Sequence, residues 1–208
     1  MDYIENMILR YPELLPLRAA CNDAVNSLAQ TYAKGGKVMT CGNGGSAADA
    51  EHIVGELMKG FLLRRPLGRA QRERLARSGC SKDLVERLQQ GIPAISLVSG
   101  VALPTACAND ICSDIVFAQQ IFNLGKAGDT LVAISTSGNS ANVLAAMHVA
   151  KSMDIQIIGL TGNTKNAMCS LADILIDVPA IVTPHIQEWH IIVYHTLCAA
   201  LEARLFTV

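Results

Sequence analysis

Two pairs of side chains in this 208-residue chain have types and spacings suited to chemistry on a polar ligand. His52 and Glu56 are spaced i, i+4, so on a helix they share one face. Gln187 and His195 are eight residues apart in a second helical stretch, about 80° apart around its axis, and could reach one cleft from successive turns. The four together could form a mixed nitrogen and oxygen metal site, or serve general acid–base catalysis on a sugar.

Spacing alone leaves other uses of these residues open. Each pair, taken singly, is more often a surface or buried hydrogen-bonding pair. His190 lies on the same predicted helix as His195 and is an equally good histidine by spacing. Asp49 and Glu51 flank His52, but we expect them to point elsewhere around the helix.

Two polar loops each leave a hydrophobic strand and open a helix. The first covers residues 41–46, Cys-Gly-Asn-Gly-Gly-Ser, and the second covers residues 135–140, Ser-Thr-Ser-Gly-Asn-Ser. Free backbone N–H groups and the helix dipole at such a position favour an anion. One such loop could be an ordinary turn, whereas two in a small protein indicate a pocket for a phosphorylated, hydroxyl-rich ligand.

Two further candidates lie near these loops. Cys41 comes just before the glycine turn, and we expect a buried strand residue rather than a ligand contact, because free cysteines are usually buried. Asn109 and Asp110 form a pair typical of a turn. Because the pair follows a predicted strand at the same sheet edge, it could also bind ligand hydroxyls.

Short β-branched strands alternate with helices along the chain, the pattern of a parallel sheet covered on both faces. We therefore expect an α/β fold, a three-layer αβα sandwich with a mainly five-stranded, doubly wound parallel sheet. The predicted strands are 37–41, 94–98, 131–135, 155–160 and 174–178, and the predicted helices are 14–33, 46–62, 114–122, 139–152 and 184–205. Right-handed crossovers would bring both polar loops to one sheet edge.

The composition predicts one domain over residues 1–208, with an N-terminal helical region at 1–34. Half of the residues are hydrophobic, the formal net charge is −1, and no run approaches the ~20 apolar residues of a membrane span. Neither nucleic-acid nor membrane partners are therefore expected. Seven cysteines without a CxxC pair, and no signal-peptide pattern, predict reduced thiols in a cytoplasmic protein.

A segment at about 64–90 differs from the rest because it holds eight of the 17 basic residues. Its pattern predicts one or two short amphipathic helices broken at Ser78-Gly79. A solvated helical hairpin is the simpler interpretation. A basic flap over a phosphorylated ligand, or a subunit contact, is the alternative.

Taken in order, the motifs resemble the sugar-isomerase (SIS) domain and, within it, the phosphoheptose isomerase family. The resemblance covers about residues 21–205. It is carried by Cys41-Gly-Asn-Gly-Gly-Ser, His52-x-x-x-Glu56-Leu, Ala108-Asn-Asp, Ile134-Ser-Thr-Ser-Gly-Asn-Ser, and Ile186-Gln-Glu-x-His followed by His195. A lone glycine loop would be weak evidence, whereas this ordered set is specific.

The resemblance implies conversion of sedoheptulose 7-phosphate to D-glycero-D-manno-heptose 7-phosphate through an enediol(ate), with Glu56 as base and His195 as acid/base partner. It also implies a homotetramer with shared active sites and one Zn²⁺ per subunit, held by His52, Glu56, Gln187 and His195. The implied substrate-binding residues are Asn43, Gly44, Ser46, Asn109, Asp110, Ser135, Thr136, Ser137, Ser140 and Gln187. Of these, Ser135, Thr136, Ser137 and Ser140 would cradle the phosphate.

Two departures from the family pattern bear on the substrate. Compact members pass almost directly from the Arg-Arg-Pro after the first helix to the next strand. In this chain roughly twenty-five residues intervene, in the segment at about 64–90. Pro184-His185 replaces acidic and basic residues often found before the Ile-Gln-Glu motif. Two alternatives stay open: an isomerase of another phosphosugar, and a non-catalytic SIS protein that binds sugar phosphate or a protein partner. A non-catalytic branch that lacks the acid matching Glu56 is disfavoured.

Overall fold

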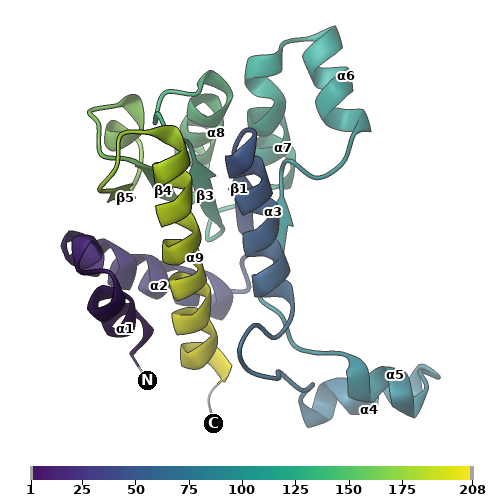
Figure 1. Cartoon of the computed structure of the whole chain (residues 1–208). Coiled ribbons are helices and arrows are strands. Elements are labelled where there is room, and N and C mark those ends of the chain that lie inside the picture. The colour runs from purple at the N-terminus through teal and green to yellow at the C-terminus, as the bar shows by residue number, and fades with distance from the viewer. Residues whose placement is uncertain (1, 207–208) are drawn as a thin grey trace.

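The computed structural model describes residues 2–206, in which one all-parallel, five-stranded sheet lies between two layers of helices (Figure 1). The strands are β1 (Val38–Cys41), β2 (Ala94–Ser96), β3 (Thr130–Ile134), β4 (Gln156–Gly162) and β5 (Ile174–Val178). Their spatial order is β2-β1-β3-β4-β5. The predicted α/β sandwich and its five strands are confirmed.

Apart from α4 and α5, the helices divide between the two faces of the sheet. They are α1 (Tyr3–Arg10), α2 (Arg18–Ala33), α3 (Gly45–Met58), α4 (Arg69–Arg77), α5 (Lys82–Arg87), α6 (Ala102–Asp110), α7 (Val116–Leu124), α8 (Ala141–Ser152) and α9 (Thr183–Phe206). Three 3-10 turns cover Pro12–Leu17, Ser113–Ile115 and Ala167–Ser170. One hydrophobic core joins α1, α2, α3 and α9 to the sheet, and a second core joins α6, α7 and α8 to its other face.

Strand β3 shows why the sheet needs both layers. All five of its residues are buried, and successive side chains point to opposite faces. Val132 and Ile134 belong to the α2, α3 and α9 core, while Leu131 and Ala133 belong to the α7 and α8 core. A strand buried on both faces reads as a continuous apolar run, which is how the sequence identified it.

Several element boundaries differ from the predicted ones. The helix expected at 14–33 begins at Arg18, because Pro12 and Pro16 put residues before it into a 3-10 turn. The helix expected at 46–62 ends at Met58. Residues 102–110, expected to end in a turn, form helix α6. Within residues 2–206, no helix is long and apolar enough to cross a membrane.

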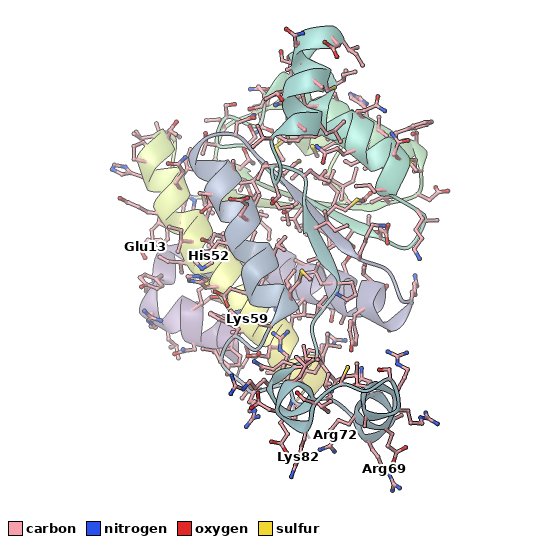
Figure 2. The ribbon with its side chains drawn as sticks, turned by 90° about the vertical axis from the view of Figure 1, so that its right-hand side faces the viewer. Glu13, His52, Lys59, Arg69, Arg72 and Lys82 are labelled. Carbon is pink, nitrogen blue, oxygen red and sulfur yellow. The ribbon has the colours of Figure 1, made fainter. Side chains whose placement is uncertain are left out.

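The basic segment forms a helical hairpin of α4 and α5 that projects from the body below α3 and α9 (Figures 1 and 2). It breaks at Ser78-Gly79, as predicted, with Gly79 at φ +86°. The helices carry almost no core, since α4 has no buried residue and α5 buries only Val85. Within a single chain, the exposure of these side chains agrees with the simpler interpretation, a solvated helical hairpin.

A buried ion pair anchors the base of this hairpin to α9. The Arg65 Nε donates to Glu202 at 2.7 Å, and both side chains are buried. The backbone N–H groups of Phe61, Leu62 and Leu63 donate to the same carboxylate at 2.7–2.9 Å. Burial alone would raise the pKa of Glu202, but these hydrogen bonds and Arg65 outweigh it, so the pKa is lowered.

Candidate active site

Helices α3 and α9 pack side by side, and three of the four predicted metal or catalytic residues meet between them (Figure 1). His52 Nε2 lies 3.3 Å from Glu56 Oε1 on the same helix. Across the helix pair, His52 Nε2 lies 3.4 Å from His195 Nε2. We call the group formed by Asp49, His52, Glu56, Tyr194 and His195 the α3–α9 seam.

Tyr194 and Asp49 lie behind His52 in this seam, and the sequence analysis assigned neither of them a role in the site. The Tyr194 hydroxyl lies 2.9 Å from His52 Nδ1 and donates to Asp49 Oδ1 at 3.3 Å. The expectation that Asp49 points away from His52 is therefore wrong. Their i, i+3 spacing was the available signal, because residues three apart are helix neighbours. Glu51 does point elsewhere, and accepts from Ser99 Oγ at 3.0 Å.

Burial sets the electrostatics of the seam. It lowers the pKa of His195, as does neighbouring His52, while Glu56 opposes the shift. It raises the pKa of Asp49 against a hydrogen bond from Tyr194 and the charge of His52. Burial thus favours the neutral imidazole of His195 over the imidazolium.

Glu56 has a second partner that sequence reasoning missed. Lys59 Nζ lies 2.7 Å from Glu56 Oε2, while Oε1 faces His52. Lys59 is well exposed, so solvent screens this ion pair and it contributes little to stability. The i, i+3 spacing of the two residues could have revealed it.

Gln187 does not join the other three predicted ligands in this chain. Its amide lies against Gly45 at the start of α3, where an added Cβ would collide with it. Gln187 and His195 are eight residues apart on α9, which separates them by about 12 Å along the helix. Within residues 2–206, no group of three or more His, Cys, Asp or Glu side chains is arranged to hold a metal ion as it stands.

His190, left open by spacing, faces a different part of the molecule. Its ring is buried, and its Nε2 lies 3.4 Å from the carbonyl oxygen of Thr161 at the end of β4. Burial lowers the pKa of His190 to about 4, against the opposing effect of Thr161. The tertiary structure thus selects His195 for the seam. Cys41 is buried in β1, as predicted.

The first polar loop is tied to the second at the sheet edge. Asn43 and Asn142, near the start of α8, exchange two amide hydrogen bonds of 2.9 Å each. Gly44 opens α3 with φ +56°, a conformation that favours glycine. Ser46 follows in the first turn of α3 and is buried.

The second loop wraps the N-terminus of α8. Ser135 and Ser140 join their hydroxyls at 2.9 Å, and Ser137 Oγ accepts from the Asn139 N–H at 3.2 Å. The backbone oxygen of Thr136 accepts from the Gly162 N–H at 3.1 Å, which fixes the loop against β4. Hydroxyls and the first N–H groups of α8 are thereby gathered where an anion is favoured.

Asn109 and Asp110 are not brought to these loops by any contact in the described residues. Both are exposed at the end of α6, and Asn109 Nδ2 donates to Asp110 Oδ1 at 2.8 Å. Helix α6 packs on α7 and on Ser113–Ile115 rather than on α3 or α8. Their predicted contact with a sugar therefore has no support within one chain.

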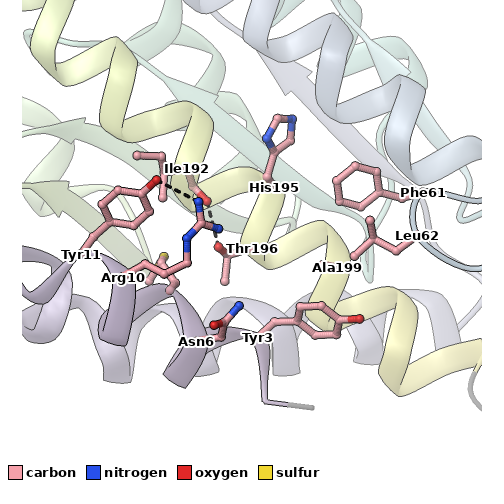
Figure 3. A pocket seen from close by; sticks show the side chains of 11 residues that line it. Tyr3, Asn6, Arg10, Tyr11, Phe61, Leu62, Ile192, His195, Thr196 and Ala199 are labelled. Atoms are coloured by element: carbon pink, nitrogen blue, oxygen red, sulfur yellow. Dashed lines mark hydrogen bonds between the residues drawn. The ribbon is translucent and has the colours of Figure 1, made fainter.

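A cavity of about 280 Å³ adjoins His195 between α1 and α9 (Figure 3). His195 and Phe61 stand on one side of it, and Arg10 and Tyr11 on the other, with Arg10 Nη2 donating to the Tyr11 hydroxyl at 3.0 Å. Of the seam residues, His195 lines this mixed polar and apolar cavity.

Comparison with known proteins gives a consistent picture. The sequence profile of the SIS domain matches residues 2–73 and 72–162. A phosphoheptose isomerase of Burkholderia pseudomallei is 36% identical over 99% of this chain and 96% of its own length. One from Shewanella baltica is 39% identical over 88% of each chain.

Solved structures agree with these relatives. A phosphoheptose isomerase from Neisseria gonorrhoeae superposes with a TM-score of 0.76 at 32% identity, over 96% of this chain and 94% of that one. A second, from Francisella tularensis, gives the same TM-score and coverage at 30% identity.

Proposed function

Because this chain belongs to the phosphoheptose isomerase family of SIS-domain proteins and is an aldose–ketose isomerase, we propose that it converts sedoheptulose 7-phosphate to D-glycero-D-manno-heptose 7-phosphate. The observation that carries the proposal is the meeting of a carboxylate and two imidazoles, Glu56, His52 and His195, in the seam. Aldose–ketose isomerisation needs a base and an acid beside adjacent carbons, and these groups supply both.

In this proposal Glu56 removes the proton from the carbon next to the substrate carbonyl, which gives an enediol(ate). His195, as acid partner in its protonated form, returns a proton to the neighbouring carbon, while the hydroxyl proton of the first carbon passes to the former carbonyl oxygen, which leaves the aldehyde. The hydroxyls of the 135–140 loop and the N-terminus of α8 hold the phosphate, far from the reacting carbons. That binding energy orients the sugar for the proton transfers.

The seam also has donors that suit a zinc ion. Ligands at 2.0–2.2 Å in a tetrahedron lie about 3.3–3.6 Å from one another. The His52–Glu56 and His52–His195 spacings are 3.3 and 3.4 Å. We infer that rotation of the Glu56 carboxylate brings its oxygen into place as the third ligand, because the His52 ring is held by its contact with Tyr194. When bound, Zn²⁺ supplies Lewis-acid polarisation of a substrate oxygen.

A zinc ligand is a poorer base, so Glu56 has to serve both purposes in turn. Its two oxygens face different partners, His52 and Lys59, which supports a carboxylate that orders the site with one oxygen and moves the proton with the other. Lys59 is exposed and can leave as substrate enters.

The separation of groups within one chain supports sites shared between subunits of a homotetramer. Glu56 lies eleven residues beyond Gly45 on α3, about 16 Å along the helix, while the phosphate loop lies at the Gly45 end. Gln187 is likewise about 12 Å from His195. A site in which a partner subunit supplies the phosphate loop and the fourth ligand would bring these groups together.

The proposal is tested by turnover of sedoheptulose 7-phosphate by purified protein, with added Zn²⁺ and after treatment with a chelator. Aldoheptose 7-phosphate formed only with metal supports both the reaction and the ligand set. Formation that ignores metal keeps the isomerase and leaves the ligands as acid–base groups. No product in either condition overturns the substrate assignment.

A further inference from the structure

A path of hydrogen bonds behind His52 has no assigned part in the reaction. It runs from His52 Nδ1 to the Tyr194 hydroxyl at 2.9 Å, and from that hydroxyl to Asp49 Oδ1 at 3.3 Å. Tyr194 and Asp49 are both buried, whereas the His52 ring is about half exposed. The path therefore leads from the interior to Nδ1 of the His52 ring, while the other ring nitrogen, Nε2, faces Glu56 and His195.

The chemistry of the three groups gives this path a direction. A carboxylate only accepts hydrogen bonds, and a tyrosine hydroxyl carries a single proton. Tyr194 donates that proton to Asp49, so towards His52 the tyrosine oxygen can only accept a hydrogen bond. The Nδ1 of His52 must then carry the proton, which leaves the lone pair on Nε2.

We propose that Tyr194 and Asp49 are positioning residues that hold His52 as its Nδ1–H tautomer, so that the Nε2 lone pair faces Glu56 Oε1 and His195 Nε2. A histidine that ligates a metal through one nitrogen needs this kind of outer hydrogen bond on the other. The proposal rests on the proposed function only in that the lone pair serves a cation held by the seam.

Two observations show that the arrangement is more than a way to satisfy the tyrosine. Asp49 Oδ2 is buried without a hydrogen-bond partner in the described residues, and Tyr194 is the one side chain there that bonds to Asp49. Burying a carboxylate with an unused oxygen costs free energy, and within residues 2–206 Asp49 forms no salt bridge that would offset this cost. If the Tyr194 hydroxyl needed only a hydrogen-bond acceptor, an uncharged group would serve, so a buried carboxylate would not be required.

Ring packing holds the same orientation. The Tyr194 ring meets His52 edge-on at 5.4 Å and His195 at 4.9 Å between centroids. The two histidine rings are themselves 4.9 Å apart and nearly perpendicular. Replacing Tyr194 with phenylalanine would keep these ring contacts and remove only the hydroxyl, so packing and hydrogen bonding can be separated.

The direct test is the tautomer of His52 in metal-free protein. With ¹⁵N-labelled histidine, the two ring nitrogens of a neutral imidazole are distinguished by their shifts, and a His52→Gln sample assigns the signal. We expect the Nδ1–H form in the parent protein and a mixture of both forms in Tyr194→Phe. A parent protein with the proton on Nε2, or a tautomer unchanged in Tyr194→Phe, overturns the proposal.

The second test is Zn²⁺ affinity by direct titration without substrate. Tyr194→Phe should weaken binding by about tenfold, the usual effect of losing an outer hydrogen bond to a ligand. Tyr32→Phe is the matched control, because the Tyr32 ring packs on Phe206 and its hydroxyl makes no hydrogen bond to the described residues. A Zn²⁺ affinity of Tyr194→Phe equal to that of Tyr32→Phe contradicts the proposed relay, that is, the hydrogen-bonded path from Asp49 through Tyr194 to His52.

Asp49→Asn tests the direction of the path. An amide can donate to the Tyr194 oxygen, which would turn the tyrosine proton towards His52 and move the histidine proton to Nε2. Because the two residues act in series, Asp49→Asn should add less than twofold to the zinc affinity lost in Tyr194→Phe. Independent losses from the two variants would refute a single relay.

The two proposals fail separately. A parent protein that binds no Zn²⁺ and isomerises nothing overturns the proposed function, while the metal-free tautomer still decides the relay. A parent protein that is active and binds zinc, but whose His52 tautomer ignores Tyr194, overturns the relay alone. Thermal midpoints of all variants identify any that lose their fold.

Discussion

The α3–α9 seam and the α4–α5 hairpin are both rich in polar side chains, yet these side chains are bonded in different ways. In the seam, His52 bonds to Tyr194 and His195, more than 140 residues away along the chain. In the hairpin, the ion pairs join residues four apart on one helix, and all are exposed. Such pairs contribute about 0.3–0.5 kcal/mol each and hold little geometry.

The difference indicates where this chain can do chemistry. Groups bonded across helices are held in one arrangement by the packing of whole elements, so their lone pairs and protons have defined directions. In the hairpin, the salt bridges of Arg69, Lys82 and Arg87 stay within one helix, and these side chains are exposed (Figure 2 labels Arg69 and Lys82). The polar loops resemble the seam, since Asn43 and Asn142 also bond across segments.

The largest expected effect comes from breaking the seam at its carboxylate. Glu56→Gln keeps the shape of the side chain but removes the base, so turnover should fall by about 10³-fold or more. Sugar-phosphate binding, measured by titration, should remain because the phosphate loop is untouched. Unchanged turnover would show that Glu56 is not the base.

A second prediction concerns the joint between hairpin and body. Glu202→Gln leaves Arg65 buried without its anion, which should lower the free energy of unfolding by about 3 kcal/mol or more at pH 7. Chemical denaturation measures it. Exposed Glu73, paired with Arg69 in the hairpin, gives the matched control Glu73→Gln, with a loss below about 0.5 kcal/mol.

The same joint predicts an acid dependence. Because the pKa of Glu202 is lowered in the folded state, its stabilisation is present above the unfolded pKa and is lost as pH falls through the folded one. The parent protein should therefore lose stability below about pH 4, and Glu202→Gln should lose less over that range. Parallel pH curves for the two would contradict this.

A smaller effect is expected at the phosphate loop. Ser137→Asp puts a carboxylate beside the proposed phosphate position, and repulsion with loss of a hydroxyl contact should raise KM by about 10- to 100-fold. The isosteric Ser137→Cys is the control for size. A normal KM in the aspartate variant would remove Ser137 from the phosphate site.

The smallest effect separates the hairpin from the seam. Arg74→Gln, on exposed α4, should change the free energy of unfolding by less than about 0.5 kcal/mol and leave turnover of the purified enzyme within twofold. A large loss of turnover would show instead that the hairpin acts as a flap over the ligand, the alternative that its charge pattern also allowed.

Much of the fold could be predicted from the sequence, because the signals are local. Continuous apolar runs such as β3 and the glycine loops after β1 and β3 locate the strands and their carboxyl ends, and parallel crossovers bring those ends together. The i, i+4 spacing of His52 and Glu56 placed both on one helix face without any tertiary information. Helix α6 was not predicted from the sequence, because its amphipathic pattern is weak.

Only the tertiary structure decided the rest of the candidate site. Spacing could not choose between His190 and His195, because both lie on α9 and only its packing against α3 turns His195 towards His52. Spacing also could not reveal the Tyr194–Asp49 path or show that Gln187 lies away from the seam, because both depend on how α9 packs against α3. A periodicity fixes which residues share a face, whereas the register between two helices depends on side-chain packing along their whole contact.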